Sequence, residues 1–151
     1  MTHLEFLGKD WDIFSGLIAD LDPKTQLLDL KKNDYGRFAV IDKMTSTVFN
    51  IYSERFYNVI LSWNERNHDS KVNSIDRFMG SCLSGLKVVV RIPYLVGHRA
   101  DIRSTIWGIE SYSCSAGIQA SENRLNMLAK REVGNKLEPR AIKQAISIAF
   151  E

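Results

Sequence analysis

Three side chains in the middle of the chain have the types needed for nucleophilic catalysis. Cys82, His98 and Asp101 would supply a thiol, a base and an acid that orients the base. Such a set requires a thiol of lowered pKa within hydrogen-bond reach of the imidazole, which spacing along the chain does not establish. Cys82 falls on the apolar side of an expected helix, where cysteine usually packs as a small core residue. We therefore predict no catalytic residue and expect a protein that is not an enzyme.

The segment 80–87 nearly spells a phosphate-binding loop. That motif needs two glycines five positions apart, followed at once by Lys and then by Ser or Thr. Here Leu86 separates Gly85 from Lys87, and Val88 stands where the hydroxyl is needed. The segment also precedes an expected strand, whereas the motif follows one. The pattern favours a helix end that passes into a strand, and we expect no nucleotide cofactor.

Metal ligation has equally little support in the residue pattern. None of the histidines has ligand spacing to another His or to a Cys. The acid pairs Asp10 with Asp12 and Asp20 with Asp22 lie near expected helix ends, where capping is the commoner role. The histidines are His3, His68 and His98. We expect no metal and no cofactor.

Positive charge gathers in the second half of the chain. Residues 1–75 carry 9 Lys+Arg and 11 Asp+Glu, a net −2, whereas residues 76–151 carry 11 and 7, a net +4. A basic half favours an anionic partner, which can be nucleic acid, an acidic membrane surface or an acidic protein surface. The candidate nucleic-acid-binding residues are Arg91, Arg99, Arg103, Arg124, Lys130, Arg131, Arg140 and Lys143.

Aromatic residues are interleaved with these basic ones. Tyr94, Trp107 and Tyr112 could stack on bases while Lys and Arg contact phosphates, as in single-strand binding proteins, although Trp107 also fits a core position. Our first hypothesis is a non-enzymatic protein that binds nucleic acid through its basic C-terminal half. The alternative is a protein-interaction module or a self-assembling structural or regulatory subunit, such as a homo-oligomer. A small enzyme with an unrecognised site ranks third.

One run near the C-terminus carries a family resemblance. It reads Leu-Glu-Pro-Arg-Ala-Ile-Lys-Gln-Ala-Ile over residues 137–146 and follows an expected strand pair and helix. This arrangement resembles the end of the annealing core in single-strand annealing recombination proteins, which often close that core with an acidic residue, a basic residue and an alanine-rich helix. The resemblance covers at most residues 86–150. It implies a nucleic-acid partner, and the N-terminal strands have no evident counterpart in it.

The bulk composition is that of one globular domain over residues 1–151, because 44% of the residues are hydrophobic and 25% are charged. The chain has two cysteines, no CxxC pair and no basic–apolar leader at its start. No apolar run approaches the length of about 18 residues that a membrane span needs. We expect an intracellular, cytoplasmic protein with reduced thiols and no membrane span.

The first half should contain a helix and several strands. Apolar spacing predicts a helix over 10–21, which Asp10 can cap and Pro23 ends. Strands are expected over 26–30 and 37–41, joined by a turn whose Asn, Asp and Gly supply positive φ. A third strand is expected over 45–52. Residues 54–64 fit both a helix and a strand, and we favour a fourth strand. These strands would form an antiparallel meander.

The second half should open with a helix over 74–84 that Gly85 ends in a left-handed conformation. A strand over 86–92 would end at Pro93 and form a hairpin with a return strand over 103–113. Two helices follow, over 116–133 and from Pro139 onward. The predicted fold class is α+β: an antiparallel β-meander and a later β-hairpin, with an N-terminal helix and two C-terminal helices packed on the sheet.

Overall fold

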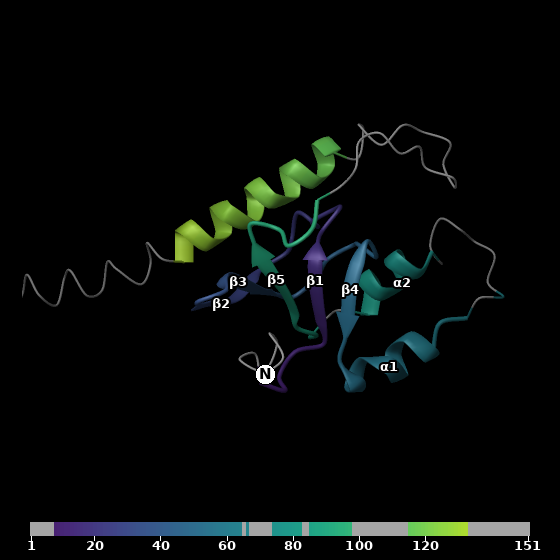
Figure 1. Ribbon diagram of the computed structural model, residues 1–151. Coiled ribbons are helices and arrows are strands. Elements are labelled where there is room, and N and C mark those ends of the chain that lie inside the picture. Colours follow the sequence, from purple (N-terminus) through teal and green to yellow (C-terminus); the bar gives the residue numbers. More distant parts are fainter. Residues whose placement is uncertain (1–7, 65, 67–73, 83–84, 98–114, 133–151) are drawn as a thin grey trace, which may run out of the picture.

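The computed structural model describes residues 8–64, 66, 74–82, 85–97 and 115–132, and within them the chain forms five strands and three helices. The strands are β1 (Ile13–Leu17), β2 (Leu27–Asn33), β3 (Gly36–Ile41), β4 (Phe49–Tyr52) and β5 (Val88–Ile92). The helices are α1 (Glu54–Leu61), α2 (Ile75–Cys82) and an unlabelled helix over 115–132 (Figure 1). The expected return strand over 103–113 and the helix from Pro139 lie outside the described residues.

The strands form one mixed sheet in the order β2-β3-β5-β1-β4 (Figure 1). β1 and β5 run parallel, and the other neighbouring strands are antiparallel. Because β5 lies between β3 and β1, β4 pairs with β1 instead of β3. The predicted meander is therefore right for its first hairpin and wrong for the pairing of its third strand, which forms over 49–52 within the expected 45–52. Both edges of β5 over Val88–Val90 are occupied, by β1 and by β3.

The predicted helix over 10–21 is wrong, because this stretch contains β1. Every residue of β1 is buried. A strand buried on both faces carries apolar side chains without regular alternation, so its pattern can imitate helical spacing. Phe14 and Leu17 are both buried and lie three positions apart, which is also the spacing of residues on one face of a helix. This spacing led to the wrong prediction of a helix.

The favoured fourth strand is also wrong, because residues 54–61 form helix α1. Ser53 is the N-cap residue, with extended φ and ψ of −73° and 158°. Phe56 is fully buried, and Val59 and Ile60 pack against the same core. Ile60, which breaks the alternation of a strand, completes the helical stripe.

The remaining described elements match the prediction. The β2–β3 hairpin, α2, β5 and the helix over 115–132 lie within one to three residues of the expected bounds. Gly85 has the expected left-handed φ, +86°, and the pairing of β5 with β3 ends at Ile92, before Pro93. In the hairpin turn only Gly36 has a positive φ, although Asn and Asp were also expected to supply one. The α+β fold class is confirmed.

All three described helices pack on one face of the sheet. Phe56 of α1, Met79 of α2 and Leu125 of the helix over 115–132 belong to one buried cluster. Alternate strand residues such as Val88 and Val90 complete it. Burial of each large side chain contributes about 1.5–3 kcal/mol. In Figure 1 the helix over 115–132 crosses the sheet toward β2 and β3, whereas α1 and α2 lie beside β4.

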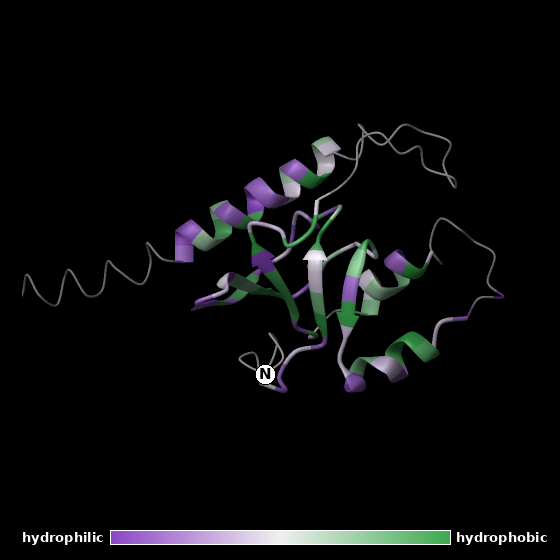
Figure 2. Ribbon diagram, in the orientation of Figure 1, coloured by the Kyte–Doolittle hydropathy of each residue, from purple (hydrophilic) through white to green (hydrophobic). Residues whose placement is uncertain are grey.

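The opposite face carries a smaller buried cluster of Phe14, Phe38, Val40 and Val89, with Trp11 packed against it. Figure 2 shows apolar residues along β5 and hydrophilic residues at the turn of the β2–β3 hairpin and along the helix over 115–132. A binding surface is therefore more to be expected at the turn of the β2–β3 hairpin and on the helix over 115–132 than along the centres of the strands.

Candidate functional site

Four of the eight predicted nucleic-acid-binding residues lie in the described part of the chain, and they do not share one face. Arg124, Lys130 and Arg131 are on the helix over 115–132. Val90 and Ile92 belong to the cluster beneath that helix, so Arg91 between them points to the opposite face of the sheet. The other four lie outside the described residues: Arg99, Arg103, Arg140 and Lys143.

The first half of the helix over 115–132 is held by contacts to loops. Ser121 Oγ donates a hydrogen bond to the Ala19 carbonyl at 3.4 Å, and the Glu122 carboxylate accepts one from the Tyr94 amide at 2.9 Å. Arg124 donates to the carbonyl of Pro23. Arg124 is therefore engaged in holding the helix against the chain that follows β1.

The second half of the same helix meets the β2–β3 hairpin. Arg37, the second residue of β3, donates from Nη2 to Asn126 Oδ1 at 3.4 Å. Lys130 follows Asn126 by four positions and therefore lies on the same side of the helix, one turn further on. Lys130 and Arg131 are both exposed. The helix and the hairpin thus bring basic residues from both halves of the chain, Lys130 and Arg37, to one side of the helix.

Lys32 adds a further positive charge at this place. It stands directly opposite Arg37 in the β2–β3 register, so the two side chains share the face on which the helix lies. Both are exposed. Like charges directly opposite each other destabilise a strand pair, so this pair is not explained by the stability of the sheet. Sequence reasoning missed Lys32 and Arg37 because it counted charge by halves of the chain.

The tip of the hairpin presents an aromatic side chain beside these charges. Tyr35 is 56% exposed. Its amide donates to Asn33 Oδ1 at 2.9 Å, and its carbonyl accepts from Arg91 Nε at 3.0 Å. Gly36 has a φ of +133°, and a Cβ there would come within 3.1 Å of Arg91 Nε. The Arg91 guanidinium therefore lies against the turn from the other face and fixes its backbone.

We use the name basic edge for the exposed surface formed by Lys32, Tyr35, Arg37 and Lys130. Arg131 lies instead on the flank of the helix that also carries Arg124 and Met127. Two carboxylates, Asp34 and Glu132, occur in the same stretches, 31–37 and 130–132. Chemically, the basic edge offers three cations that can contact phosphate or carboxylate groups and one ring that can stack on a planar group.

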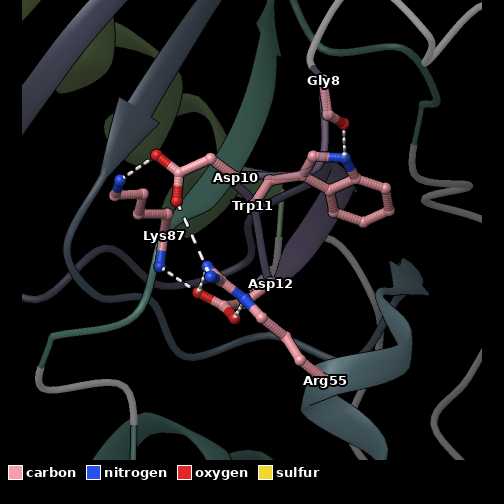
Figure 3. Close-up of polar contacts among 6 residues, drawn as sticks. All are labelled: Gly8, Asp10, Trp11, Asp12, Arg55 and Lys87. Atoms are coloured by element: carbon pink, nitrogen blue, oxygen red, sulfur yellow. Dashed lines mark hydrogen bonds and ion pairs between the residues drawn. The ribbon is translucent and has the colours of Figure 1, made fainter.

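A second cluster of charged residues lies at the start of β1 (Figure 3). Asp12 is 1% exposed. Its carboxylate accepts two hydrogen bonds from Arg55, at 2.5 Å from Nε and 2.9 Å from Nη2, and one from the Lys87 amide at 2.6 Å. The Asp12 amide in turn donates to the Lys87 carbonyl at 2.9 Å. Asp12 thus joins the beginnings of β1, α1 and β5.

Asp10 lies on the outer side of this cluster and is 68% exposed. It pairs with the Lys87 ammonium, and an Arg55 nitrogen lies 3.6 Å from its carboxylate. The hydrogen bond from Lys87 lowers the pKa of Asp10, and the hydrogen bond to Asp12 raises the pKa of Arg55. The two acids and two bases neutralise one another, so the cluster is better suited to holding β1, α1 and β5 together than to binding an anion.

The described structure does not assemble a catalytic, phosphate-binding or metal site from the other residues that the sequence suggested. Cys82 is half-buried at the end of α2, 4.0 Å from Ser81 Oγ, while His98 and Asp101 lie outside the described residues. The Lys87 ammonium, which the phosphate-loop reading would have used, is paired with Asp10. Within the described ranges, no group of three or more His, Cys, Asp or Glu residues could hold a metal ion. Nor does that part of the chain contain a helix long and apolar enough to cross a membrane.

Comparison with known proteins adds no assignment. No protein-family model, curated protein or solved structure matches the chain. The resemblance to single-strand annealing proteins receives no support from these comparisons, and the run over 137–146 lies outside the described residues. Any function for this chain must therefore be argued from the geometry of its exposed residues.

Proposed function

We propose that this protein binds single-stranded nucleic acid, without catalysis, through the basic edge. The observation that carries the proposal is the direct pairing of Lys32 with Arg37, at the point where Arg37 contacts the helix that carries Lys130 one turn beyond Asn126. A protein gains no stability from gathering like charges in this way, whereas a phosphate backbone would neutralise them.

Tyr35 favours a single strand over a duplex as the ligand. A ring at the tip of a tight turn can stack on an unpaired base, which duplex DNA does not offer without unstacking. The hydrogen bonds from the Tyr35 amide to Asn33 and from Arg91 to the Tyr35 carbonyl hold the turn in place. An ordered turn loses little conformational entropy on binding, which favours affinity.

The test is fluorescence anisotropy with a labelled 20-nucleotide single strand, its duplex and, as competitor, polyglutamate. We expect the single strand to bind more tightly than the duplex. Tyr35→Ala should weaken binding by roughly 5- to 150-fold, because stacking contributes about 1–3 kcal/mol per base. The matched control is Tyr57→Ala on α1, which removes a tyrosine of similar exposure, 52%, far along the sheet from the hairpin.

Two outcomes would contradict the proposal. The first is no binding of either oligonucleotide at about 50 mM salt, where phosphate contacts are strong. The second is equal competition by polyglutamate and the single strand with no effect of Tyr35→Ala, which would indicate an acidic protein surface as the partner.

A further inference from the structure

The two outer strands of the sheet differ in how they are protected against pairing with another chain. β2 carries charged residues along its length, including Lys31 and Lys32, and its pairing with β3 shifts register between Leu27 and Asp29. Charge and irregularity are the usual devices that block an edge. β4 also pairs irregularly, since its register with β1 shifts opposite Asn50 and Phe49, but it has no charged residue within Phe-Asn-Ile-Tyr. Within the described residues, β4 pairs only with β1, on one side.

β4 also exposes apolar side chains. Val48, just before the strand, is 51% exposed, Phe49 is 39% exposed and Ile51 is 41% exposed. The sequence from residue 44 to residue 53 contains no charged residue. Phe49 extends over β1, where a Cβ on Gly16 would come within 2.5 Å of its ring. An uncharged, apolar edge of this kind is a template for strand addition.

We infer that β4 pairs antiparallel with β4 of a second copy of this chain, giving a two-fold dimer with one continuous ten-stranded sheet. A second copy is the occupant that the charges favour, because an uncharged strand places no like charges opposite each other when it meets itself. The inference stands on β4 alone and does not depend on nucleic-acid binding.

Symmetry restricts the register of this pairing. When a two-fold axis relates two antiparallel strands in one sheet, a residue must lie opposite its own copy, at Asn50 or at Ile51. Pairing about Ile51 would place Phe49 opposite Ser53 of the second copy, which is the polar N-cap residue of α1 and not part of the strand. Pairing about Asn50 instead places Phe49 opposite Ile51 of the second copy, and the reverse. Such aromatic–β-branched pairs stabilise antiparallel strands, so the register is centred on Asn50.

This arrangement fixes the geometry of the dimer. The axis is perpendicular to the sheet, so the helices of both copies lie on the same face. The two β2–β3 hairpins lie at opposite ends, roughly 40–45 Å apart, since neighbouring strands are about 4.8 Å apart. The contact between two short strands falls in the small class of interfaces, below about 1,200 Å² in total, so the dimer should dissociate on dilution.

The test is sedimentation velocity of the full chain from about 5 to 500 µM. The wild type should shift from monomer toward dimer. Ile51→Lys should remain monomeric at the highest concentration, because it puts a charge opposite Phe49 of the second copy. Leu28→Lys, at an exposed apolar position on the opposite edge strand β2 (50% exposed, against 41% for Ile51), is the matched control and should dimerise as the wild type does. An equimolar mixture of Ile51→Lys and Ile51→Glu should regain the dimer, since the two substituted residues lie diagonally across the axis.

A wild type that stays monomeric at 500 µM would overturn the inference, as would an Ile51→Lys variant that dimerises like the wild type. Failure of the mixture to dimerise would overturn the antiparallel pairing of β4 with its copy. Circular dichroism reports whether each variant is folded. If Ile51→Lys does not fold, Val48→Lys replaces it, because Val48 precedes the strand and lies opposite Tyr52 of the second copy in the proposed register.

Discussion

Removal of the Asp12 carboxylate should destabilise the fold mainly by leaving one backbone amide without a partner. In Asp12→Ala the part-buried Lys87 amide loses its acceptor at 2.6 Å, which costs up to about 1–3 kcal/mol. The Arg55 side chain is 49% exposed and can turn to water, so loss of its ion pair adds at most about 1 kcal/mol. We expect the free energy of unfolding to fall by about 1–4 kcal/mol.

Asp12→Asn separates the two contributions. Its amide oxygen can still accept from the Lys87 amide, while the charge that faces Arg55 is gone, so the loss should stay near 1 kcal/mol. Urea denaturation followed by circular dichroism gives both values, and equal m values would show that the unfolded states are comparable. Lys9→Ala, an exposed neighbour, is the control. If Asp12→Asn loses as much stability as Asp12→Ala, the acceptor role of Asp12 is refuted.

Three further predictions address charge, turn and packing. Because Lys87 lowers the pKa of Asp10 below its ordinary 3.8, their pair stabilises the fold above about pH 4 and loses this effect as the pH falls through the lowered value. Asp10→Asn should thus lower the urea midpoint at pH 6 and match the wild type near pH 2; an equal deficit at both pH values would contradict this. Gly36→Ala should cost about 1 kcal/mol or more, since its φ is +133° and the new Cβ would crowd Arg91; an unchanged urea midpoint would count against the turn geometry. Leu125→Ala should lower the free energy of unfolding by about 2–5 kcal/mol, because Leu125 is fully buried between its own helix, over 115–132, and the sheet; a loss below 1 kcal/mol would mean that this helix is not docked.

Local patterns predicted the β2–β3 hairpin and β5 well, and β1 and α1 poorly. The hairpin has polar turn residues, whereas residues 54–64 fit both a helix and a strand, and the favoured strand was wrong although Phe56, Val59 and Ile60 form a helical stripe. β1 is buried on both faces, so its sequence lacks the alternation by which strands are recognised. The three consecutive valines of β5 did indicate a buried strand, but no local signal showed that β5 would lie between β3 and β1.

The candidate site was only partly predictable for a similar reason. Lys130 was among the expected residues, but Lys32 and Arg37 come from the half of the chain with net negative charge. Their register across the hairpin and the contact of Arg37 with Asn126 depend on folding. The sequence did contain a signal for this site, because Lys31, Lys32 and Arg37 surround Tyr35 within seven residues. Basic residues next to an aromatic residue are the combination that binds single-stranded nucleic acid.

The most direct test of the basic edge is the salt dependence of binding to a single-stranded oligonucleotide. Each phosphate contact contributes a slope of about −0.7 to log K against log salt, so the three basic side chains of the basic edge predict a slope near −2. The double variant Lys32→Ala with Arg37→Ala should reduce that slope by about 1.4, whereas Arg77→Ala on α2 should leave it unchanged. A slope near zero in the wild type, or an equal slope in the double variant, would contradict the account.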